Sequence, residues 1–358
     1  MAKSKSKKIK EKGCVKCTKV SKFNPTNPRV KADFIKALYK SRSKGCWIGD
    51  LAKRFETSEA AIVKLANILS KQGYNITRDE EDNLHVNNVV PPMPNLNIKK
   101  LRGKEITFGV VSDTHLCSKY SRLDVLEAAY DMFEQQGITQ VFHGGNIIDG
   151  EFKFNKYEIL AHGIHDQTNY LADHYPQRAG ITTYFISGDC HEGWFMKDTG
   201  LNVGWYMENW CRERGRKDLI HIGHLEQDVV FNRPGGDFRM RIIHPGGGTP
   251  YATSYPSQKM VESFQGGDKP QLLIMGHFHK FDFGYPREVA CLLPGATQDQ
   301  TGFMRKKKLA SHVGFCMCNL GVRDDGTLGE IGVKWIPFYD VAYHRHFNTK
   351  DFKMPGTK

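Results

Sequence analysis

Residues 141–150, VFHGGNIIDG, decide the fold of the longer part of this chain. An apolar run that stops at a pair of glycines is typical of a buried strand that ends in a tight turn. Asn146 and Asp149 follow the glycines, so polar side chains lie where the strand stops. The segment therefore predicts a strand of a layered α/β domain, with a functional site at the carboxyl end of that strand.

The same arrangement recurs at four other predicted strand ends. Polar residues directly follow the apolar run in VVSDTHL (110–116), SGDCHEG (187–193), IIHPGG (242–247) and MGHFHK (275–280). Because side chains alternate along a strand, we expect the pairs Asp113/His115 and His277/His279 each to point to one side of a strand end. Imidazole and carboxylate groups gathered in this way favour a divalent metal site over core packing.

In this order the five segments resemble the pattern of the calcineurin-like metallophosphoesterase superfamily: D-x-H, G-D-x-x-D, G-N-H-(D/E), a lone His and G-H-x-H. The resemblance implies an α/β fold, a layered calcineurin-like metallophosphoesterase β-sandwich flanked by helices. It also implies two divalent metal ions and a bridging hydroxide that attacks a phosphoester. With imidazole and carboxylate ligands, manganese is the expected metal, and zinc, iron or nickel are the alternatives.

The resemblance also implies which residues bind the metal ions. Asp113, His115 and His279 would bind the first ion. His244 and His277 would bind the second. All five have the residue type that the family pattern has at the same place.

Two further ligand positions depart from the family pattern. Asn146 stands where the family has the aspartate that bridges the metals, and its amide lacks the negative charge, so metal loading and hydrolysis should be weaker. It is either a deliberate Asp-to-Asn change that traps substrate, a natural variant with weaker activity, or part of a degenerate site kept for binding. Cys190 falls where the family has a metal-binding Asn; alternatively Asp189 reaches in, and the loop has one extra residue.

Two other residues would carry the catalysis. His191 matches the catalytic histidine of the family, which steadies the phosphoryl oxygens or protonates the leaving group. Asp149 is expected to orient its neighbours and to support catalysis in that way. Together with the ligand set, these residues predict a metal-dependent phosphoesterase, a hydrolase that acts on phosphodiester bonds.

The positive charge of the chain is concentrated at its amino end. Residues 1–31 contain eleven Lys and Arg residues against Glu11, so 11 − 1 = +10 of the net charge of +12 lies there. We expect a disordered tail that either holds polyanions or only keeps the protein in solution. No apolar run approaches the roughly 20 residues that cross a bilayer, and no signal peptide is recognisable, which predicts a cytoplasmic protein of a bacterial or phage-infected cell with no membrane partner.

Residues 32–88 predict a separate small domain. Apolar residues recur at helical spacing in three blocks, and two strand-like stretches then flank an acidic turn. This order resembles a winged helix-turn-helix, whose third helix would present Lys64 and Lys71 to a DNA groove. Winged helices also serve as protein-docking modules, and the acidic turn weakens the DNA interpretation. The proline-rich residues 89–104 predict a linker to a domain at 105–340, and 341–358 are expected to be a C-terminal tail.

A basic cluster follows the last metal motif, in LLPGATQDQTGFMRKKK (292–308). Metallophosphoesterases of phages and prophages are similar here, with a glutamine-containing loop before basic residues. The cluster, Arg305, Lys306, Lys307 and Lys308, would contact a phosphate backbone, or else it is a solvated basic loop.

The prediction that combines these features is a dimetal phosphodiesterase that acts as a DNA nuclease, with DNA as its partner. One alternative is a phosphatase or a small-molecule phosphodiesterase, for example for cyclic nucleotides, whose amino-terminal module docks proteins. Another is a non-catalytic DNA-binding protein. The oligomeric state is left open by the sequence.

Overall fold

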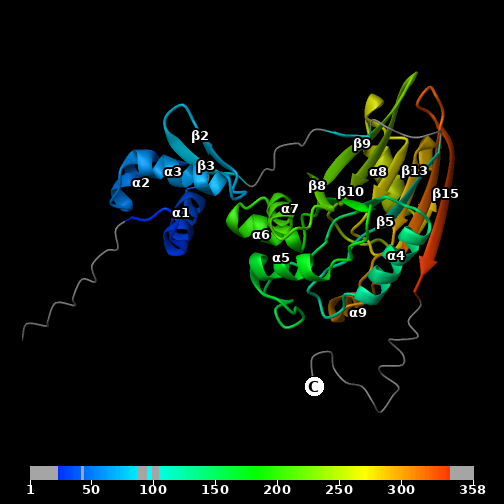
Figure 1. Ribbon diagram of the computed structural model, residues 1–358, viewed down its shortest axis with the longest axis horizontal. Helices are drawn as coiled ribbons and strands as arrows, with labels where there is room; N and C mark the ends of the chain where they lie inside the picture. The colour runs from blue at the N-terminus through cyan, green and yellow to red at the C-terminus, as the bar shows by residue number, and fades with distance from the viewer. Residues whose placement is uncertain (1–22, 42–43, 88–94, 99–104, 339–358) are drawn as a thin grey trace, which may run out of the picture. The chain divides into compact units, whose positions relative to one another are not determined.

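The computed structural model describes residues 23–41, 44–87, 95–98 and 105–338 (Figure 1). The predicted tail at 341–358 and most of the predicted basic tail lie outside the described residues. The chain divides into two compact units. One contains the residues up to Leu69 together with Arg78–His85, and the other contains Ser70–Thr77 and the residues from Val86 on.

Three helices and a small sheet occupy the amino-terminal part of the described chain. The helices are α1 (Pro28–Lys40), α2 (Ile48–Arg54) and α3 (Glu59–Ser70). The sheet has the order β1-β3-β2, with β1 (Cys46–Trp47), β2 (Ile76–Arg78) and β3 (Asn83–Val86). The apolar faces meet in a core that contains Phe34, Leu38, Ile62 and Leu65, all fully buried. The helices and the hairpin β2–β3 lie where the periodicity predicts them, whereas β1 is an addition.

Helix α1 begins inside the segment 1–31 that the charge pattern predicts to be disordered. Asn27 caps it, because its side-chain oxygen accepts a hydrogen bond from the Arg29 N–H at 2.9 Å. Pro28 stands in the first turn, where its missing N–H leaves no helical hydrogen bond unmade. The capping residue therefore starts the helix inside the basic segment, before residue 31.

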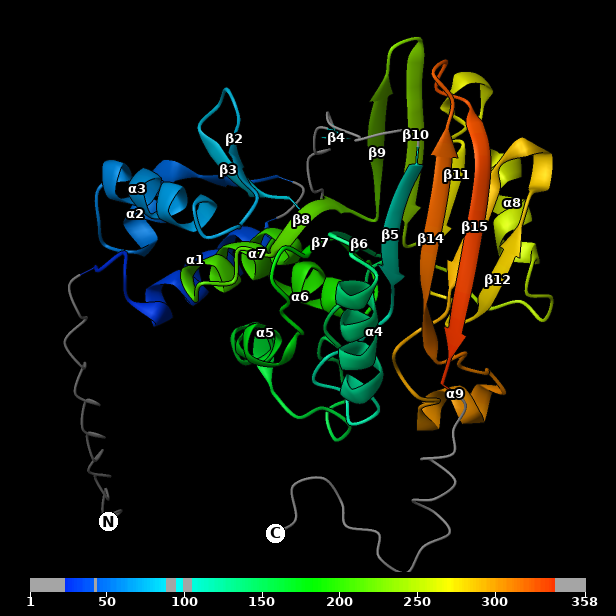
Figure 2. The same ribbon diagram turned by 45° about the vertical axis from the view of Figure 1, so that its right-hand side comes forward.

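Two six-stranded sheets make up most of the second unit (Figure 2). The first sheet has the order β15-β14-β5-β6-β7-β8 and is built from β5 (Glu105–Val111), β6 (Gln140–His143), β7 (Thr182–Ser187), β8 (Leu219–His224), β14 (Gly314–Val322) and β15 (Leu328–Pro337). The second has the order β12-β13-β11-β10-β9-β4 and is built from β4 (Leu96–Ile98), β9 (Glu226–Arg233), β10 (Gly236–Ile243), β11 (Leu272–Met275), β12 (Phe281–Gly284) and β13 (Ala290–Pro294).

The two sheets pack face to face because their strands alternate. In β11, Leu272 and Ile274 point into a core that also contains Phe108 of β5 and Phe142 of β6. Leu273, the residue between them, belongs to a different cluster on the outer face of the second sheet. This period of two, with apolar residues on both faces, is what a strand covered on both sides requires.

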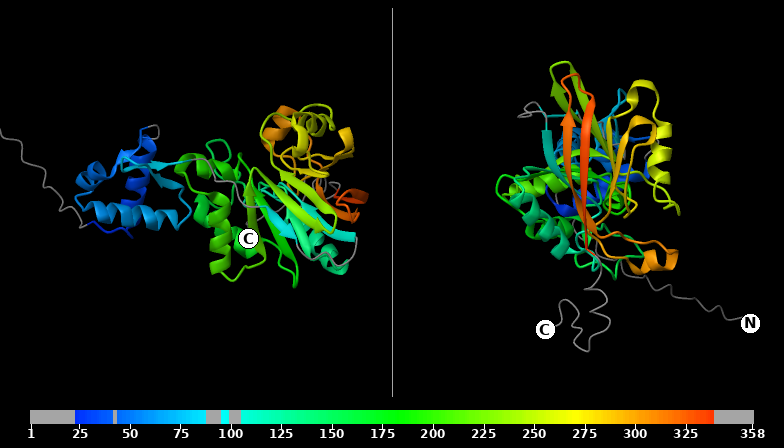
Figure 3. Two further views of the ribbon diagram at one scale, coloured as in Figure 1. Left: turned by 90° about the horizontal axis from the view of Figure 1, so that it is seen from above. Right: turned by 90° about the vertical axis from the view of Figure 1, so that its right-hand side faces the viewer.

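Helices cover the outer faces of this sandwich (Figure 3). Those packed on the first sheet are α4 (Leu123–Gln135), α5 (Gly163–His174), α6 (Glu192–Thr199) and α7 (Val203–Glu213). Helix α8 (Tyr255–Ser263) packs on the second sheet through Val261. The short elements are α9 (Gly302–Lys307) and the 3₁₀ turns η1 (Gly266–Asp268) and η2 (Pro286–Glu288). The predicted layered α/β architecture, a β-sandwich flanked by helices, is what the second unit has.

Strand direction brings the candidate residues to one edge of each sheet. Strands β5, β6 and β7 run parallel to one another in the first sheet, and β10 and β11 run parallel in the second. All candidate metal and catalytic residues follow the carboxyl ends of these five strands. Carboxyl ends of parallel strands lie at the same edge, which is where sites form in open α/β sheets.

Several elements differ from the sequence-based expectation. Leu96–Ile98, inside the predicted linker 89–104, forms β4 and pairs in parallel with β9 from Leu96↔Val229 onward. Strands β8, β9 and β12 and the helices α6, α8 and α9 are not predicted, because their short or mixed patterns match no single period. Within the described part of the chain, no helix has the length and apolar content that a membrane span needs.

Candidate metal centre

The backbone of the centre is left-handed at six candidate residues. Positive φ values occur at Asp113 (50°), His115 (44°), Asn146 (55°), His191 (56°), His277 (82°) and His279 (53°). Such conformations cost on the order of 1–3 kcal/mol each and persist where the surrounding structure fixes them, typically at functional sites. The pairs Asp113/His115 and His277/His279 do converge, but the expectation that strand alternation aims them is wrong. Their strands end at Val111 and Met275, and the residues lie in the turns that follow.

Four side chains converge on one carboxylate oxygen, Oδ1 of Asp113. The Nε2 atoms of His115, His279 and His244 lie 3.7, 3.4 and 3.9 Å from it. The amide nitrogen of Asn146 lies 3.4 Å from the same oxygen. Two ligands of one transition-metal ion, each about 2.0–2.2 Å from it, are roughly 3–4 Å apart. The spacing of the three imidazole nitrogens from Oδ1 therefore suits metal ligands, whereas the Asn146 amide nitrogen donates a hydrogen bond to that oxygen.

Asp113 is held by its other carboxylate oxygen. Oδ2 accepts hydrogen bonds from Ser112 Oγ at 2.6 Å and from the His277 backbone N–H at 2.9 Å. Burial would raise the pKa of this carboxyl, but the nearby imidazoles of His279 and His244 hold it well below its usual range. Asp113 is thus a carboxylate with one oxygen anchored and the other directed at the histidines.

Asn146 and His244 direct unsatisfied atoms into the same centre. Asn146 Oδ1, His244 Nε2 and His279 Nδ1 are among the four buried side-chain atoms that have no hydrogen-bond partner within the described residues. His244 donates from Nδ1 to the Gly144 carbonyl at 2.6 Å, which leaves the lone pair on Nε2. Burial lowers the pKa of His244 to about 4, so the ring stays neutral at physiological pH. A neutral imidazole with a buried free lone pair fits a metal ligand.

Asp149 links two of the candidate histidines. Its Oδ1 accepts a hydrogen bond from His115 Nδ1 at 2.9 Å, and its backbone carbonyl accepts one from His191 Nδ1 at 3.0 Å. Asn155 donates to Oδ2 at 3.0 Å. Burial opposes the charge of Asp149, yet the two histidines lower its pKa below the usual range. Asp149 is therefore placed to orient the rings that face the centre.

His115 gains a proton from this arrangement when no metal is bound. Burial lowers its pKa, but the hydrogen bonds to Asp113 and Asp149 outweigh burial and raise the pKa to about 9. Metal ligands must be deprotonated, so a cation bound at Nε2 would replace that proton. Asp113, His115 and His279 form one group that could hold a metal ion, and His115, Asp149 and His191 form another. The residues of the centre thus fit a divalent cation.

The other predicted ligands are held less directly. His277 lies edge-to-face against His244, with ring centroids 5.3 Å apart, but its Nε2 is hydrogen-bonded to the Gly247 carbonyl at 2.9 Å. Neither Cys190 nor Asp189 belongs to a metal-binding group within the described residues. Asp189 instead accepts a hydrogen bond from Lys197 Nζ at 2.9 Å. Burial raises the pKa of the Cys190 thiol, so the thiol is protonated when no cation is bound.

Glu192 is a residue of the centre that sequence reasoning missed. Its fully buried carboxylate accepts hydrogen bonds from the backbone N–H groups of Asn146 (3.0 Å), Ile148 (3.2 Å) and Gly188 (2.7 Å). Burial raises its pKa to about 7, although the three N–H groups oppose that shift. Glu192 therefore fixes the Asn146 turn to the turn after β7. The signal was its position as the acidic residue that ends the G-N-H-(D/E) pattern.

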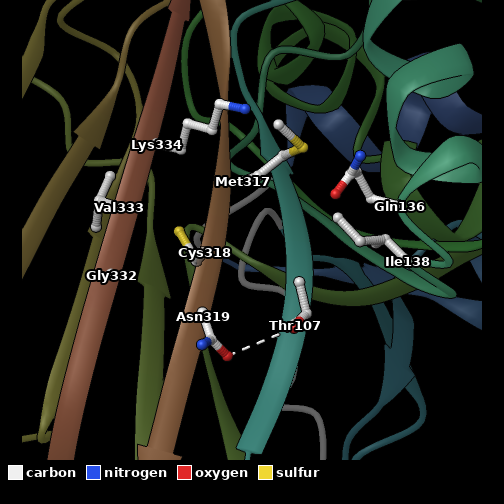
Figure 4. A pocket seen from close by; sticks show the side chains of 9 residues that line it. All are labelled: Thr107, Gln136, Ile138, Met317, Cys318, Asn319, Gly332, Val333 and Lys334. Carbon is white, nitrogen blue, oxygen red and sulfur yellow. Dashed lines mark hydrogen bonds between the residues drawn. The ribbon is translucent and has the colours of Figure 1, made fainter.

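A cleft of about 480 Å³ opens beside the centre. Asn146, Asp149, His191, His277 and His279 line it on the side of the metal centre. The rest of its wall includes Phe154, Phe303 and Lys307. A second pocket of about 390 Å³ lies on the first sheet, lined by residues such as Thr107, Met317 and Lys334, and contains none of the candidate residues (Figure 4).

The predicted nucleic-acid contacts lie in two places. Lys64 is exposed on α3, and Lys71 is exposed just after that helix. Arg305, Lys306 and Lys307 form the last turn of α9, and Lys308 follows as its left-handed cap. Of these six residues, Lys307 lines the cleft.

Fold and centre together define a phosphoesterase. The model of the calcineurin-like phosphoesterase superfamily domain matches residues 106–311, a segment that contains every candidate metal and catalytic residue. This match covers more than half of the chain, so the chain belongs to the calcineurin-like phosphoesterase superfamily, whose members are generally metal-dependent hydrolases. No curated protein matches the chain.

Several solved structures are similar to the chain at low identity. An archaeal phosphodiesterase is 12% identical with a TM-score of 0.34, and the match covers 64% of this chain and 100% of that one. GAP50, the anchor in the inner membrane complex of Plasmodium, is 14% identical with a TM-score of 0.38, over 66% and 85%. Vps29 of Entamoeba histolytica complexed with Zn²⁺ is 12% identical with a TM-score of 0.30, over 65% and 99%. Similarity this low carries no conclusion about substrate.

Proposed function

We propose that this chain is a dimetal phosphodiesterase that cleaves DNA, of the type found in phages and prophages, and that it acts in the cytoplasm. The observation that carries the proposal is the convergence of His115, His244, His279 and Asn146 on Asp113 Oδ1 beside an open cleft. The basic last turn of α9 supports a polyanionic substrate, because Lys307 lines that cleft.

Two divalent cations, with manganese expected, would polarise the phosphoester and lower the pKa of an attacking water. Asp113, His115 and His279 would hold one, His244 and His277 would hold the other, and Asn146 would offer its amide oxygen. The Nε2 of His277 is hydrogen-bonded to the Gly247 carbonyl, so Nδ1 is the nitrogen that His277 would offer to a cation. Asp113 brings one charged oxygen to the centre, and the buried neutral His244 brings one lone pair.

His191 would serve the leaving group or the phosphoryl oxygens. Its Nδ1 donates to the Asp149 carbonyl, so the other ring nitrogen is the one available for proton exchange. The ring lines the cleft and lies edge-to-face against His115, with centroids 4.3 Å apart. Asp149 contacts both rings and would keep their orientation fixed. A neutral His191 accepts a proton at Nε2, and a protonated His191 donates it there.

Asn146 is expected to limit the activity of the chain as it stands. Between two dications, an amide oxygen supplies no negative charge, so the second cation should bind more weakly. Six other residues keep the type that the family pattern has, which supports a catalytic origin of the site: Asp113, His115, His191, His244, His277 and His279. A non-catalytic DNA-binding protein is the second candidate. It is favoured by this amide and by the 188–190 loop, no residue of which belongs to a metal-binding group within the described part of the chain.

The amino-terminal helices and sheet support a DNA-docking role. Three helices followed by a hairpin that pairs with a short strand are what a winged helix-turn-helix contains, and we propose that identity for residues 32–88. Lys64 and Lys71 at the third helix would contact the phosphate backbone, and the basic residues 1–31 would add salt-dependent affinity.

A paired assay tests the proposal. The chain as written and the Asn146→Asp variant are each given Mn²⁺ with labelled single-stranded DNA, double-stranded DNA and bis(p-nitrophenyl) phosphate. We expect the aspartate variant to cut DNA, and the double variant Asn146→Asp, Asp113→Ala to be inactive as a control against contaminating nuclease. Hydrolysis of the small ester alone by both proteins would contradict the DNA assignment. Metal binding without hydrolysis of any ester would favour the non-catalytic candidate.

A further inference from the structure

Four aromatic rings pack against one another, and two of them, Phe154 and Phe303, line the metal cleft. Phe152, Phe154 and Phe303 are 41%, 56% and 51% exposed, which is unusual for rings that could pack into a core. Trp194 packs among them, with its ring centroid 5.3 Å from both Phe152 and Phe154. We call Phe152, Phe154, Trp194 and Phe303 the aromatic rim.

The aromatic rim is connected to the catalytic end of the cleft by direct ring contacts. His191 lies 4.6 Å from Trp194 between ring centroids, and Trp194 lies edge-to-face against Phe154. Phe154 in turn stacks on Phe303 at 6.0 Å, with an angle of 23° between the ring planes. A ligand on the rim is therefore next to the residue that would contact the phosphoryl group.

The rim comes from separate parts of the chain that meet at the cleft. Phe152 and Phe154 follow β6, Trp194 is in α6 and Phe303 is in α9. Phe303 and Lys307 are four residues apart on α9, so they lie on one face of that helix, and both line the cleft. Glu158 also lines it, so the charge of the cleft is mixed. The π-faces and the cation together suit a ligand that has both a flat ring and a phosphate.

We infer that the aromatic rim stacks an unpaired nucleobase next to the scissile phosphate, so that the substrate is a single strand or a frayed end. This inference rests on the proposed phosphodiesterase function and names its substrate class. A base in a duplex is already stacked on both faces, whereas an unpaired base offers a free face to Phe154 or Phe303. Stacking tolerates any base, so the rim would select strandedness and not sequence.

The test compares base-containing and abasic DNA. Binding of fluorescein-labelled dodecathymidylate, and of the same oligomer with abasic sites, is measured with the Asn146 protein and Mn²⁺. We expect abasic substitution to weaken binding about five- to a hundredfold, the range for loss of one stacked base. Phe154→Ala and Phe303→Ala should cause a similar loss for the normal oligomer and almost none for the abasic one. The effects of removing the ring and of removing the base should therefore not add, as expected when the ring stacks on the base.

Matched controls separate stacking from a general disturbance. Phe283→Ala removes a ring that is 39% exposed on β12 and does not line the cleft. This change should therefore leave the affinities for the normal and the abasic oligomer unchanged. Bound Mn²⁺, measured by electron paramagnetic resonance, should be unchanged in the rim variants. Phe303→Leu keeps the apolar bulk without the π-face and should behave like Phe303→Ala.

Three outcomes would overturn the inference. If the rim variants weaken both oligomers equally, the rim supports the fold and not a base. If Asn146→Asp cleaves DNA while normal and abasic oligomers bind alike, the inference fails and the nuclease proposal stands. If the protein binds neither oligomer but binds a phosphotyrosine peptide through Phe154, both the nuclease proposal and the base subsite are wrong.

Discussion

The two halves of the metal centre differ in how well they can bind a cation. His115 and His279 form the first half, and His244 and His277 form the second. In the first half, the two Nε2 atoms lie 3.2 Å apart and both face Asp113 Oδ1. In the second half, His244 has a free Nε2, and His277, whose Nε2 is hydrogen-bonded to the Gly247 carbonyl, has Nδ1 left for a cation. Asn146 contributes an amide where a carboxylate would serve both halves. The first half is therefore ready for a cation, and the second is short of charge.

The difference teaches that a shared fold does not make two adjacent positions equally strong. Both halves use histidines at the carboxyl ends of parallel strands, and both rely on left-handed turns. What separates them is the charge and the hydrogen-bond partners of single residues, which decide whether a ligand atom is free for a cation. We therefore expect one tightly bound and one weakly bound metal ion, and the predictions below bear on that asymmetry.

The largest effect is expected from Asp113→Asn. This change removes the carboxylate oxygen that all four neighbouring side chains face, while its amide oxygen can still accept a hydrogen bond from Ser112. Tightly bound manganese should fall from about one ion per chain to almost none, because the remaining ligands are neutral. In the Asn146→Asp background, hydrolysis should fall roughly a thousandfold, which corresponds to about 4 kcal/mol of transition-state stabilisation. Metal analysis of desalted protein checks the first expectation, and retention of one tightly bound ion would contradict it.

A smaller effect, a gain in metal affinity, is expected from Asn146→Asp. The added charge should strengthen binding of the second Mn²⁺ by roughly tenfold or more, which requires only about 1.4 kcal/mol. Affinity for the first ion should change less, because Asp113 already supplies charge there. Calorimetric titration with Mn²⁺ resolves the two steps. Asn319→Asp, an exposed amide-to-carboxylate change on β14, is the matched control, and an equal gain in that variant would show a general charge effect.

The sequence predicts the residues of the metal centre better than it predicts the turns and contacts that position them. Five strand ends with polar residues were enough to name Asp113, His115, His244, His277 and His279, since parallel strands must bring their carboxyl ends together. The left-handed turns were not predictable, because alternation along a strand was the only local rule available. The choice between Cys190 and Asp189 depends on a turn that ends at the positive φ of His191 and so follows no period.

Contacts between distant segments were also beyond sequence reasoning. Glu192 binds backbone N–H groups of the turn after β6, a partnership that leaves no pattern in residue types. Phe154 and Phe303 read as ordinary apolar residues until the fold brings them together. Motifs indicate the chemistry of a site, whereas the contacts that position its residues come from segments that are distant in the sequence.

A moderate loss of stability is expected from Glu192→Gln. A glutamine has one acceptor oxygen, so at least one buried N–H of Asn146, Ile148 or Gly188 loses its partner, at a cost of about 1–3 kcal/mol. Because the same bonds fix the Asn146 turn, affinity for the second metal ion should fall as well. Urea unfolding of metal-free protein measures the first effect. Glu134→Gln, an exposed change on α4, should leave the unfolding midpoint in place, and equal midpoints for both variants would show that the buried bonds contribute nothing.

The smallest effect is expected from Asp189→Ala and Cys190→Ser. Asp189 is paired with Lys197, and neither Asp189 nor Cys190 belongs to a metal-binding group within the described residues, so neither should supply a ligand to the second half of the centre. Manganese affinity should change by less than about twofold in either variant. The ion pair between Asp189 and Lys197 lies at the surface, where such pairs contribute only about 0–1 kcal/mol to stability. A tenfold loss in one of them would mean that the loop rearranges when the cation binds. That residue would then be the missing ligand, and the asymmetry between the two halves would belong to the metal-free protein alone.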